Sequence, residues 1–377
     1  MKKILIVAMA DSVHTARWLR QFDDDEIEFV LFPSTPHRRI HSLLLQHASI
    51  SAKSTITISK WMKRGGLPLG VADLLLNNRL RSALLAKAID AFKPDLIHVM
   101  ETQHAGYLTD RALNSTTHKS KLALSIWGSD LFWFQRFPKH QRRIRSLLKK
   151  VGVLITECQR DEDLARDLGF NGTCIYGVPA SGGFDYQEFM SAEHNLPPSK
   201  RKIIAVKGYS GFVGLGLAAI KVLGRTSDLA SDYKTVVFSA NWKTWFVARI
   251  VKFRTGLEIE VRMKHSQSSE QMRSLFSASR VVMGVSKSDG LPATIKEAAF
   301  FGAFPVQTNT SCAGEWFKEG VSILLVPADS PDALELALRA ALTDDNLVDS
   351  AAILNLEIAK TMMDRFAVRS KISLLYS

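Results

Sequence analysis

Cysteine is scarce in this sequence. Cys158, Cys174 and Cys312 are the only three among 377 residues, and they are widely spaced. No Cys-x-x-Cys pair and no cluster of cysteine with histidine occurs. The odd number and the spacing argue against a disulfide framework and against a zinc site, and they are typical of a protein from a reducing compartment.

Long apolar runs are missing as well. No stretch reaches the ~18 apolar residues that a membrane-spanning helix needs. The apolar run from Ile4 to Ala10 follows two lysines, but Asp11 ends it and no small-residue cleavage site lies behind it. We therefore expect this run to form a buried strand rather than a signal sequence, and we expect a cytoplasmic protein.

Acidic residues are fewer than basic residues. Lysine and arginine number 49 against 37 for aspartate and glutamate, which gives a net charge of +12. Phosphate-bearing small molecules, nucleic acid and anionic membrane surfaces would all be attracted by such a field. A soluble basic protein that binds none of these is the alternative.

What the sequence does contain is a regular alternation of short apolar runs with helical periodicity. Strands that are apolar on both faces and alternate with helices indicate a parallel sheet covered on both sides. In the first half the runs predict strands at residues 4–9, 27–32, 55–58, 96–100, 122–126, 153–156 and 173–176. In the second half they predict strands at residues 202–206, 235–239, 257–262, 281–285, 304–308 and 323–326.

Helices are predicted between these strands, and the alternation is interrupted once. Examples are residues 71–92, 159–168, 212–223, 242–253 and 268–278, with a helical closing stretch at 344–377. Residues 179–201 are rich in glycine and proline and lack periodicity, so we interpret them as a linker. The length suits two domains of roughly 150–200 residues each. The sequence thus predicts an α/β protein with two Rossmann-like, doubly wound domains.

The loop after the fourth predicted strand of the second half carries the strongest ligand signature. It contains Asp289, Gly290, Leu291 and Pro292, and Glu297 lies on the first turns of the helix that follows. Ligands of open parallel sheets bind at the carboxyl ends of the strands, and a helix N-terminus there attracts an anion. Glu297 suits a ribose diol and Asp289 suits sugar hydroxyls; alternatively, Asp289 is only the N-cap of the helix.

The segment from Ser286 to Val306 resembles the signature of family 4 glycosyltransferases with the GT-B fold. That family carries a glutamate, seven residues, a second glutamate and then Ala-Met-Ala-x-Gly-x-Pro-Val. Here Asp289 replaces the first glutamate. Its side chain keeps the charge but is shorter, which affects the geometry of its contact with the donor sugar. Further similar segments occur in the same order along the chain: residues 12–18, 94–99, 125–130, 325–327 with the helix at 331–334, and a closing helix around 365–377.

The resemblance implies the architecture and the reaction. Two Rossmann-like domains would face each other across a cleft, with residues 1–185 binding the acceptor and residues 200–355 binding the nucleotide sugar. A closing helix within residues 356–377 would return to the N-terminal domain. The implied reaction is transfer of a hexose-type sugar, with retention, from a UDP- or GDP-linked donor, with no cofactor and no metal.

The resemblance also implies donor contacts in the loop after the first strand of the second domain. In the family this loop holds Gly-Arg and a later lysine, and both cations contact the diphosphate. Here Lys207 precedes Gly208, and Phe212 stands where the later lysine is expected. We expect at least one cation near the diphosphate, because a charge-assisted bond to phosphate contributes ~1.5–3 kcal/mol. Either one cation suffices, or a second one comes from one of three residues: Lys243, Lys264 or Lys287.

Acceptor-side and catalytic candidates follow strands of the first half. Ser12 and His14 follow the first strand in the segment similar to the family's acceptor loop, and Glu101 and His104 follow the strand at residues 96–100. Their polar side chains suit acceptor hydroxyls. A lone histidine is more often structural than catalytic, so a structural role is the alternative for both imidazoles.

The loop at residues 125–130 departs from the family. Trp127 stands where members commonly have a histidine near the reacting carbon of the donor, so that imidazole is not a required acid or base here. Asp130 keeps its place, and it either orders the loop, contacts an acceptor hydroxyl or caps the next helix. Asp130 and His14 join Asp289 as candidate catalytic residues.

Basic residues stand beside aromatic residues in the first half. The stretch from Arg136 to Lys150 has seven lysines and arginines and no acid, next to Trp133 and Phe134, and a second cluster is Lys60–Arg64. This composition suits an anionic lipid surface, although a solvated basic face is the alternative. We predict a peripheral enzyme on the inner face of the membrane that extends a lipid-linked glycan or lipopolysaccharide.

Three other functions are less well supported by the sequence. Nucleotide-sugar 2-epimerases share the GT-B fold and need no acceptor. A dinucleotide oxidoreductase is disfavoured because the first turn contains no glycine. A nucleic-acid-binding protein would explain the charge, but no RRM, KH or helix-turn-helix pattern occurs, so we expect no nucleic-acid partner. The sequence predicts neither the base and sugar of the donor, nor the acceptor, nor the oligomeric state.

Overall fold

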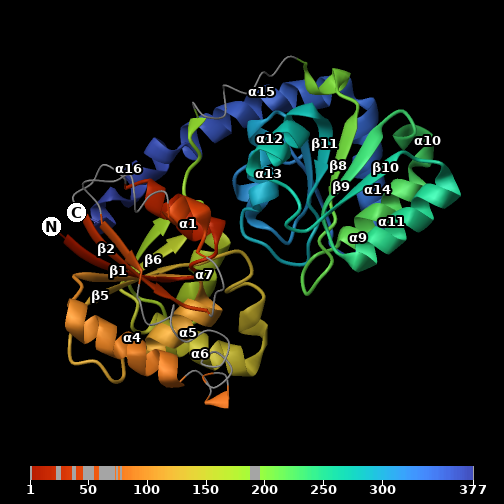
Figure 1. Ribbon diagram of the computed structural model, residues 1–377. Helices are drawn as coiled ribbons and strands as arrows, with labels where there is room; N and C mark the ends of the chain where they lie inside the picture. The colour runs from red at the N-terminus through yellow and green to blue at the C-terminus, as the bar shows by residue number, and fades with distance from the viewer. Residues whose placement is uncertain are drawn as a thin grey trace. The chain divides into compact units, whose positions relative to one another are not determined.

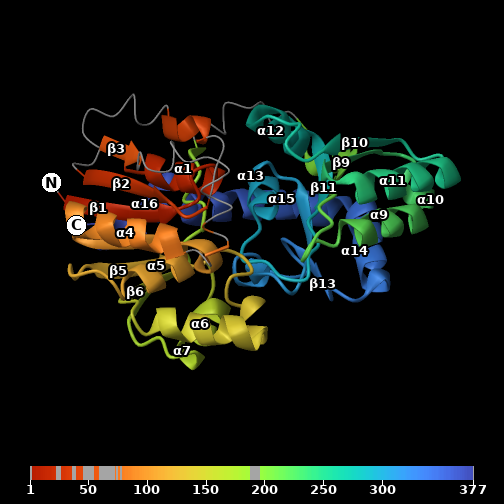
Figure 2. The same ribbon diagram turned by 60° about the horizontal axis from the view of Figure 1, so that its bottom comes forward.

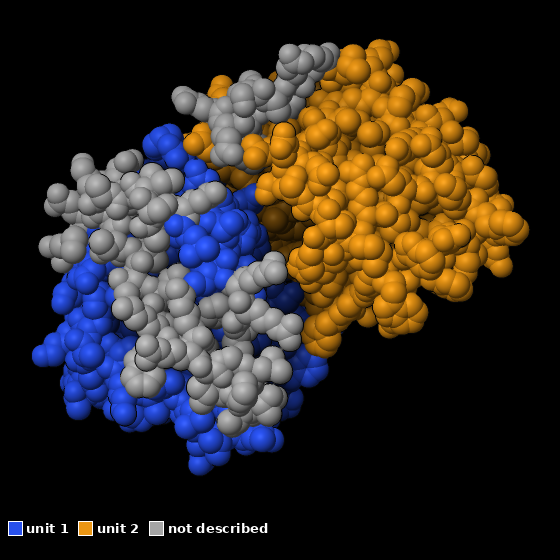
Figure 3. All heavy atoms as spheres, viewed as in Figure 1, with its two compact units in different colours: residues 1–183, 365–377 blue, residues 184–364 orange. Residues whose placement is uncertain are grey.

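A computed structural model describes residues 2–22, 27–35, 40–45, 55–58, 73, 75–76, 79–186 and 196–376. The basic cluster Lys60–Arg64 lies outside the described residues. The chain divides into two compact units, coloured in Figure 3: unit 1 is residues 1–183 and 365–377, and unit 2 is residues 184–364. The domain limits suggested by the sequence, at residues 185, 200 and 355, stay predictions.

Unit 1 is built on a parallel sheet that has seven strands within the described residues, in the order β3-β2-β1-β4-β5-β6-β7. Figure 2 shows β3 at one edge, beyond β2 and β1. The strands are β1 (Lys2–Ala8), β2 (Ile27–Pro33), β3 (Thr55–Ile58), β4 (Leu96–Met100), β5 (Lys121–Ser125), β6 (Val153–Thr156) and β7 (Thr173–Tyr176).

Helices cover both faces of this sheet (Figure 1). They are α1 (Val13–Arg20), α4 (Arg79–Phe92), α5 (Tyr107–Ala112), α6 (Pro138–Leu148), α7 (Gln159–Asp167) and α16 (Arg365–Tyr376). Successive β1 side chains point to opposite faces: Leu5 and Val7 join the core under α4, α5 and α6, whereas Ile4 and Ile6 join the core under α1 and α16. Both faces are therefore apolar, as the continuous apolar runs predict.

Unit 2 contains a second parallel sheet, with six strands in the described part of the chain, in the order β10-β9-β8-β11-β12-β13. Its strands are β8 (Ile203–Lys207), β9 (Lys234–Ala240), β10 (Ile259–Met263), β11 (Ser279–Met283), β12 (Phe304–Thr308) and β13 (Leu324–Val326). Its helices are α9 (Gly216–Arg225), α10 (Ser227–Ala230), α11 (Trp242–Thr255), α12 (Ser269–Ala278), α13 (Ala293–Phe300), α14 (Pro331–Thr343) and α15 (Asp345–Met362).

The predicted fold class is confirmed, and each predicted strand is present within about two residues of its expected limits. Helix α4 runs from Arg79 within the helix predicted at 71–92; of residues 71–78 only 73, 75 and 76 are described, and Asp73 and Leu75 are helical. One helix begins later than expected. Helix α9 begins at Gly216, because the residues just before it pair with a neighbouring loop. No helix in the described residues is both long enough and apolar enough to cross a bilayer.

Candidate functional site

The strand order of unit 2 places its candidate donor loops side by side. From β8 the chain first adds β9 and β10 on one side and then returns to add β11, β12 and β13 on the other. The point between β8 and β11 is therefore the topological switch point, where the loops after the two strands diverge and open α/β sheets bind ligands. Lys207 ends β8, and the segment with Asp289 follows β11.

Backbone pairing ties these two loops together. Gly214 and Ser286 form an antiparallel bridge, and the Lys287 N–H donates to the Val213 carbonyl at 2.7 Å. The Leu215 N–H donates to the carbonyl of Val285 at 3.2 Å. This pairing holds residues 212–215 outside α9, and it brings the exposed Lys287 side chain to the same part of the sheet edge as Lys207.

Positions 208 and 216 require glycine because neighbouring atoms lie too close to the backbone there for a side chain. A Cβ on Gly208 would lie 2.7 Å from Val237 Cγ1 and 3.1 Å from the Cα of Ala240. A Cβ on Gly216 would lie 2.7 Å from the carbonyl carbon of Gly208. The first turn of α9 therefore packs directly on the backbone that leaves β8, which fixes the position of the Lys207–Gly208 peptide.

Two threonines anchor the loop after β11. The Ser286 N–H donates to Thr308 Oγ1 at 3.0 Å, and the hydroxyls of Thr308 and Thr310 both donate to the Ser286 carbonyl at 2.6 Å. Thr308 ends β12, so the loop is clamped to the neighbouring strand. Sequence reasoning missed both threonines, although two hydroxyls directly after a buried strand are a signal that can be read.

Helix α13 begins without a side-chain cap within the described residues. Its N-cap is Pro292, which offers no acceptor group on its side chain, and Ala293 is its first residue. Asp289 does not cap it: Asp289 Oδ1 accepts from the Gly290 N–H at 3.0 Å, three residues upstream of the helix. The alternative that Asp289 is an ordinary N-cap is therefore wrong. An uncapped N-terminus keeps its partial positive charge, which stabilises an anion by ~0.3–1 kcal/mol.

The structure brings together most of the donor-side candidates. Asp289, Gly290, Leu291 and Pro292 form the approach to α13, and Glu297 lies on its second turn. Leu291 and Pro292 are buried, whereas the two carboxylate side chains are half-buried.

Lys264 is the exception among these candidates. It directly follows the edge strand β10, and its N–H donates to the Ala240 carbonyl at 2.9 Å. Strand β9 separates it from β8, so Lys264 starts from a position about 10 Å away from that strand, at roughly 4.8 Å per strand spacing. Lys287, in the paired loops themselves, is the better placed second cation.

The acceptor-side candidates flank the switch point of the sheet in unit 1. That sheet reverses between β1 and β4; Ser12 and His14 follow β1, and Glu101 and His104 follow β4. Ser12 is the N-cap of α1, and its Oγ accepts from the His14 N–H at 3.2 Å. The His14 ring meets the ring of Trp127 edge-on, with centroids 5.3 Å apart.

Glu101 organises the turn that follows β4. Its backbone has φ 78°, in the left-handed region, and its side chain is almost fully buried. The carboxylate accepts from the backbone N–H groups of Gln103, His104 and Ala105 at 3.0, 2.6 and 2.5 Å, and so caps the π-helical turn η1 (Thr102–Gly106). A side chain that satisfies three amides offsets the strain of its own backbone.

His104 and Asp130 both interact with Glu101. The Nδ1–H of His104 donates to Glu101 Oε2 at 3.2 Å, and this bond raises the pKa of the exposed imidazole, although partial burial opposes it. Asp130 Oδ2 accepts from the N–H groups of Thr102 and Trp127 at 2.8 and 3.0 Å. Burial, and then the negative charge of Glu101, raise the pKa of Asp130 well above its ordinary value. Asp130 thus orders its own loop and joins it to η1, rather than capping the next helix.

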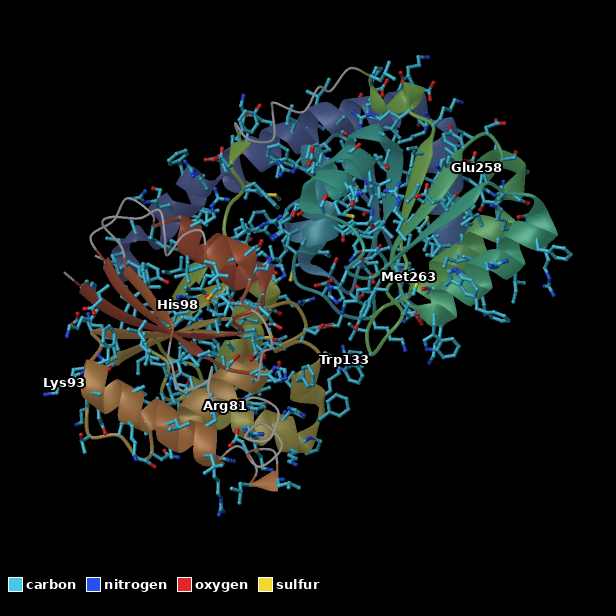
Figure 4. The ribbon with its side chains drawn as sticks, in the orientation of Figure 1. Arg81, Lys93, His98, Trp133, Glu258 and Met263 are labelled. Atoms are coloured by element: carbon cyan, nitrogen blue, oxygen red, sulfur yellow. The ribbon has the colours of Figure 1, made fainter. Side chains whose placement is uncertain are left out.

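A buried polar chain in unit 1 was not predicted. Trp18 Nε1 donates to Tyr376 Oη at 2.9 Å, Tyr376 is hydrogen-bonded to His98 Nδ1, and His98 Nε2 is 2.7 Å from Ser125 Oγ. Tyr376 Oη accepts the Trp18 N–H, and the neutral imidazole of His98 uses one of its two bonded ring nitrogens as donor and the other as acceptor. Figure 4 shows His98 among the side chains of this sheet. Burial lowers the pKa of His98 to about 3.

Two family models match the chain. The model described as glycosyl transferase 4-like matches residues 3–157, within unit 1, and the model described as glycosyl transferases group 1 matches residues 219–353, within unit 2. No curated relative matches the sequence.

Solved structures of similar fold cover the whole chain. HepE (Alr3699) from Anabaena, in complex with UDP-glucose, has 13% identity and a TM-score of 0.72, over 100% of this chain and 99% of that one. Sucrose-phosphate synthase from Thermosynechococcus elongatus has 14% identity and a TM-score of 0.70, over 100% and 98% of the two chains. The α,α-trehalose-phosphate synthase (UDP-forming) from Burkholderia vietnamiensis has 11% identity and a TM-score of 0.71, over 100% and 99%.

The two glycosyltransferase matches lie one after the other, one in each unit, and the structural neighbours have the same fold of two doubly wound sheets. This chain therefore belongs to the family 4-like glycosyltransferases with the GT-B fold, and it is a glycosyltransferase.

Proposed function

We propose that the protein transfers a hexose-type sugar from a UDP- or GDP-linked donor to a glycan or lipid-linked glycan acceptor, with retention of configuration. The observation that carries the donor part is the pairing of the β8 and β11 loops at the switch point, next to the uncapped N-terminus of α13. The complex of HepE with UDP-glucose and the UDP-forming trehalose-phosphate synthase support a UDP-linked donor.

In this proposal, the diphosphate lies against the first turn of α13, with Lys207 and Lys287 as its cations. Glu297 accepts hydrogen bonds from the ribose diol, and Asp289 accepts them from hydroxyls of the sugar. Each charge-assisted bond to phosphate contributes ~1.5–3 kcal/mol, so two lysines and a helix terminus suffice to stabilise the leaving group without a metal ion.

The proposed chemistry balances within the two substrates. The bond from the anomeric carbon to the diphosphate oxygen breaks, and the acceptor oxygen forms its bond on the same face of the sugar. The proton of the acceptor hydroxyl passes to the departing diphosphate oxygen. The protein's share is to orient both substrates and to stabilise the negative charge that develops on the diphosphate. Asp130 and His14 are proposed to act on the acceptor side.

Ligand-dependent thermal unfolding in EDTA tests the donor proposal. UDP or GDP at 100 times its Kd should stabilise the fold by about 2.7 kcal/mol, which is several degrees, whereas CMP should not. Lys207→Ala and Lys287→Ala should each reduce the shift, and Lys221→Ala on α9 is the matched control. A larger loss in Lys264→Ala than in Lys287→Ala would identify Lys264 as the second cation. No response to any nucleotide would contradict the proposal.

Turnover separates transfer from its closest rival. Asp289→Asn should keep nucleotide binding and lose most transfer activity, because the amide group cannot replace the charged acceptor for the sugar hydroxyls. Near-normal turnover would remove Asp289 from its proposed role. A new nucleotide sugar formed without any acceptor would instead indicate a 2-epimerase.

We further propose that the enzyme works peripherally at the inner face of a membrane, in the synthesis of cell-surface polysaccharide or lipopolysaccharide. Arg136, Lys139, Arg142, Arg145 and Lys149 are exposed on and beside α6, which supports an electrostatic contact. Flotation with anionic vesicles should weaken when three of these cations are changed to glutamine. If the variant floats as well as the wild type, the stretch from Arg136 to Lys150 is only a solvated basic face.

A further inference from the structure

Helix α11 of unit 2 carries its aromatic side chains on the outside. Trp242, Phe246 and Phe253 are 69%, 56% and 91% exposed, and Trp245 is 39% exposed. Figures 1 and 2 both show α11 on the outside of unit 2, next to α9. Large exposed apolar groups gathered on one element mark an interaction surface, whereas scattered ones do not.

The three most exposed aromatic side chains form a single stripe together with Arg249. Trp242, Phe246, Arg249 and Phe253 follow the spacing i, i+4, i+7, i+11, which keeps them within roughly 60° of one another around the helix at 100° per residue. The opposite side of α11 packs into unit 2 through small and branched residues: Thr244, Val247, Ala248 and Val251. The helix thus has two apolar faces, and the more aromatic one faces away from the core.

Cations flank the stripe, and α11 contains no acid. Lys243 and Arg254 lie on one side of the stripe and Lys252 on the other, at the positions given by the same helical period. Lys243 Nζ lies 5.7 Å from the centre of the Trp242 ring, and the Arg249 guanidinium lies 4.9 Å from that of Trp245. A row of aromatics between rows of cations matches the boundary between acyl chains and anionic headgroups.

The helix is well fixed at both ends. Asn241 and Thr244 form a reciprocal capping box at its N-terminus, and Gly256 ends it in the left-handed conformation with φ 74°. The exposed stripe therefore stands on a rigid helix rather than on a loop, so the face is formed before any partner binds.

We propose that α11 is an interfacial helix that seats unit 2 on an anionic lipid bilayer, with Trp242, Phe246 and Phe253 in the headgroup boundary and the flanking cations on lipid phosphates. This inference rests on the proposed membrane association and adds to it a surface in unit 2, whereas α6 belongs to unit 1. The charge pattern favours lipid over a second copy of this chain, because two such helices would bring eight cations together without an acid between them.

Vesicle flotation of the full chain tests this surface. Wild-type protein should float with vesicles of equal parts phosphatidylcholine and phosphatidylglycerol, and less with phosphatidylcholine alone or at high salt. The variant Trp242→Ser/Phe246→Ser/Phe253→Ser should lower the partition coefficient by on the order of tenfold or more. The matched control Leu336→Ser/Ile353→Ser removes similarly exposed apolar groups from α14 and α15, and it should float like the wild type.

A second variant separates charge from apolar contact. Lys252→Gln/Arg254→Gln should weaken binding to the anionic vesicles and lower its dependence on salt. Equal flotation of both α11 variants and the wild type would overturn the proposal. So would a wild-type dimer that the serine variant dissociates without any change in flotation, because a second copy would then occupy the face. Nucleotide-dependent unfolding of each preparation shows separately whether the donor proposal stands.

Discussion

Asp130 accepts a hydrogen bond from the backbone N–H of Thr102 at 2.8 Å and thereby joins the loop after β5 to the loop after β4. The same Oδ2 atom accepts from the Trp127 N–H. One buried oxygen therefore holds two loops that both carry acceptor-side candidates. Mutations of Asp130 can show whether this hydrogen bonding or the charge of the carboxylate is needed.

Asp130→Ala should destabilise unit 1 by ~1–3 kcal/mol for each amide left without its partner. Asp130→Asn keeps an oxygen that can accept both bonds and should cost much less. Urea unfolding gives the two values, with Asp167→Asn at the exposed end of α7 as control. If Asp130 acts only on loop order, Asp130→Asn retains activity; loss of turnover in that stable variant would show that the charge itself is needed.

Glu101→Gln should lower the pKa of His104, because the bond from the imidazole to the carboxylate is what raises it. A raised folded pKa contributes stability that is fully present below about pH 6.5 and is lost as the pH rises through the folded pKa. The stability difference between wild type and variant should therefore shrink as the pH rises through that range. Imidazole NMR titration measures the pKa directly, and an unchanged His104 pKa would contradict the assigned pair.

Tyr376→Phe should destabilise unit 1, because it leaves the Trp18 indole N–H and His98 Nδ1 buried without their partner. The expected loss is ~1–3 kcal/mol per orphaned group. Urea unfolding and proteolysis of α16 report the effect, and Ser373→Ala on an exposed part of the same helix is the control. Equal stability of the two variants would show that the polar chain contributes nothing net.

The same buried polar chain, from Trp18 to Ser125, predicts that the protein loses stability in acid. His98 has a folded pKa of about 3 against an ordinary value of 6.5, so the unfolded state binds a proton between these pH values and the native state does not. Stability should be full above pH 6.5 and fall towards pH 3, by about 1.4 kcal/mol per pH unit from this group. His98→Gln should flatten that slope in urea-unfolding curves taken across the range. A slope identical to the wild type would assign the effect to other groups.

Gly208→Ala should weaken nucleotide binding at least tenfold, because the added Cβ would lie 2.7 Å from Val237 Cγ1 and push the β8 loop off its strand. Gly152→Ala is the matched control in unit 1, since its added Cβ meets only one atom, at 3.7 Å. Calorimetric titration with UDP compares the two. Normal binding by Gly208→Ala would show that the loop can shift without loss of the site.

Sequence reasoning correctly predicted the elements that depend on a single apolar run or on one local helical period. The run at residues 304–308 is apolar enough to predict β12 with its observed limits, and the helix predicted at residues 268–278 is present as α12, with Ser268 as its N-cap. The candidate donor loop could be proposed from the sequence for the same reason, because Asp289 and Glu297 belong to one short continuous segment.

Features that depend on tertiary contacts could not be predicted in this way. The start of α9 depends on the bridge between Gly214 and Ser286, and the contact of His14 with Trp127 joins loops of two different strands. The hydrogen bond between His98 and Tyr376 spans 278 positions in the sequence. No local period records such pairs, so the sequence does not predict which of these residues contact one another.

Helix α16 lies in the core of unit 1, although all of unit 2 precedes it in the sequence. During synthesis on the ribosome, residues 184–364 emerge and can fold before the residues that complete unit 1 are made. Until then the apolar face that receives Val368 and Ile372 stays uncovered and open to chaperones or to aggregation. The order of translation therefore makes the first unit to emerge the last to finish folding.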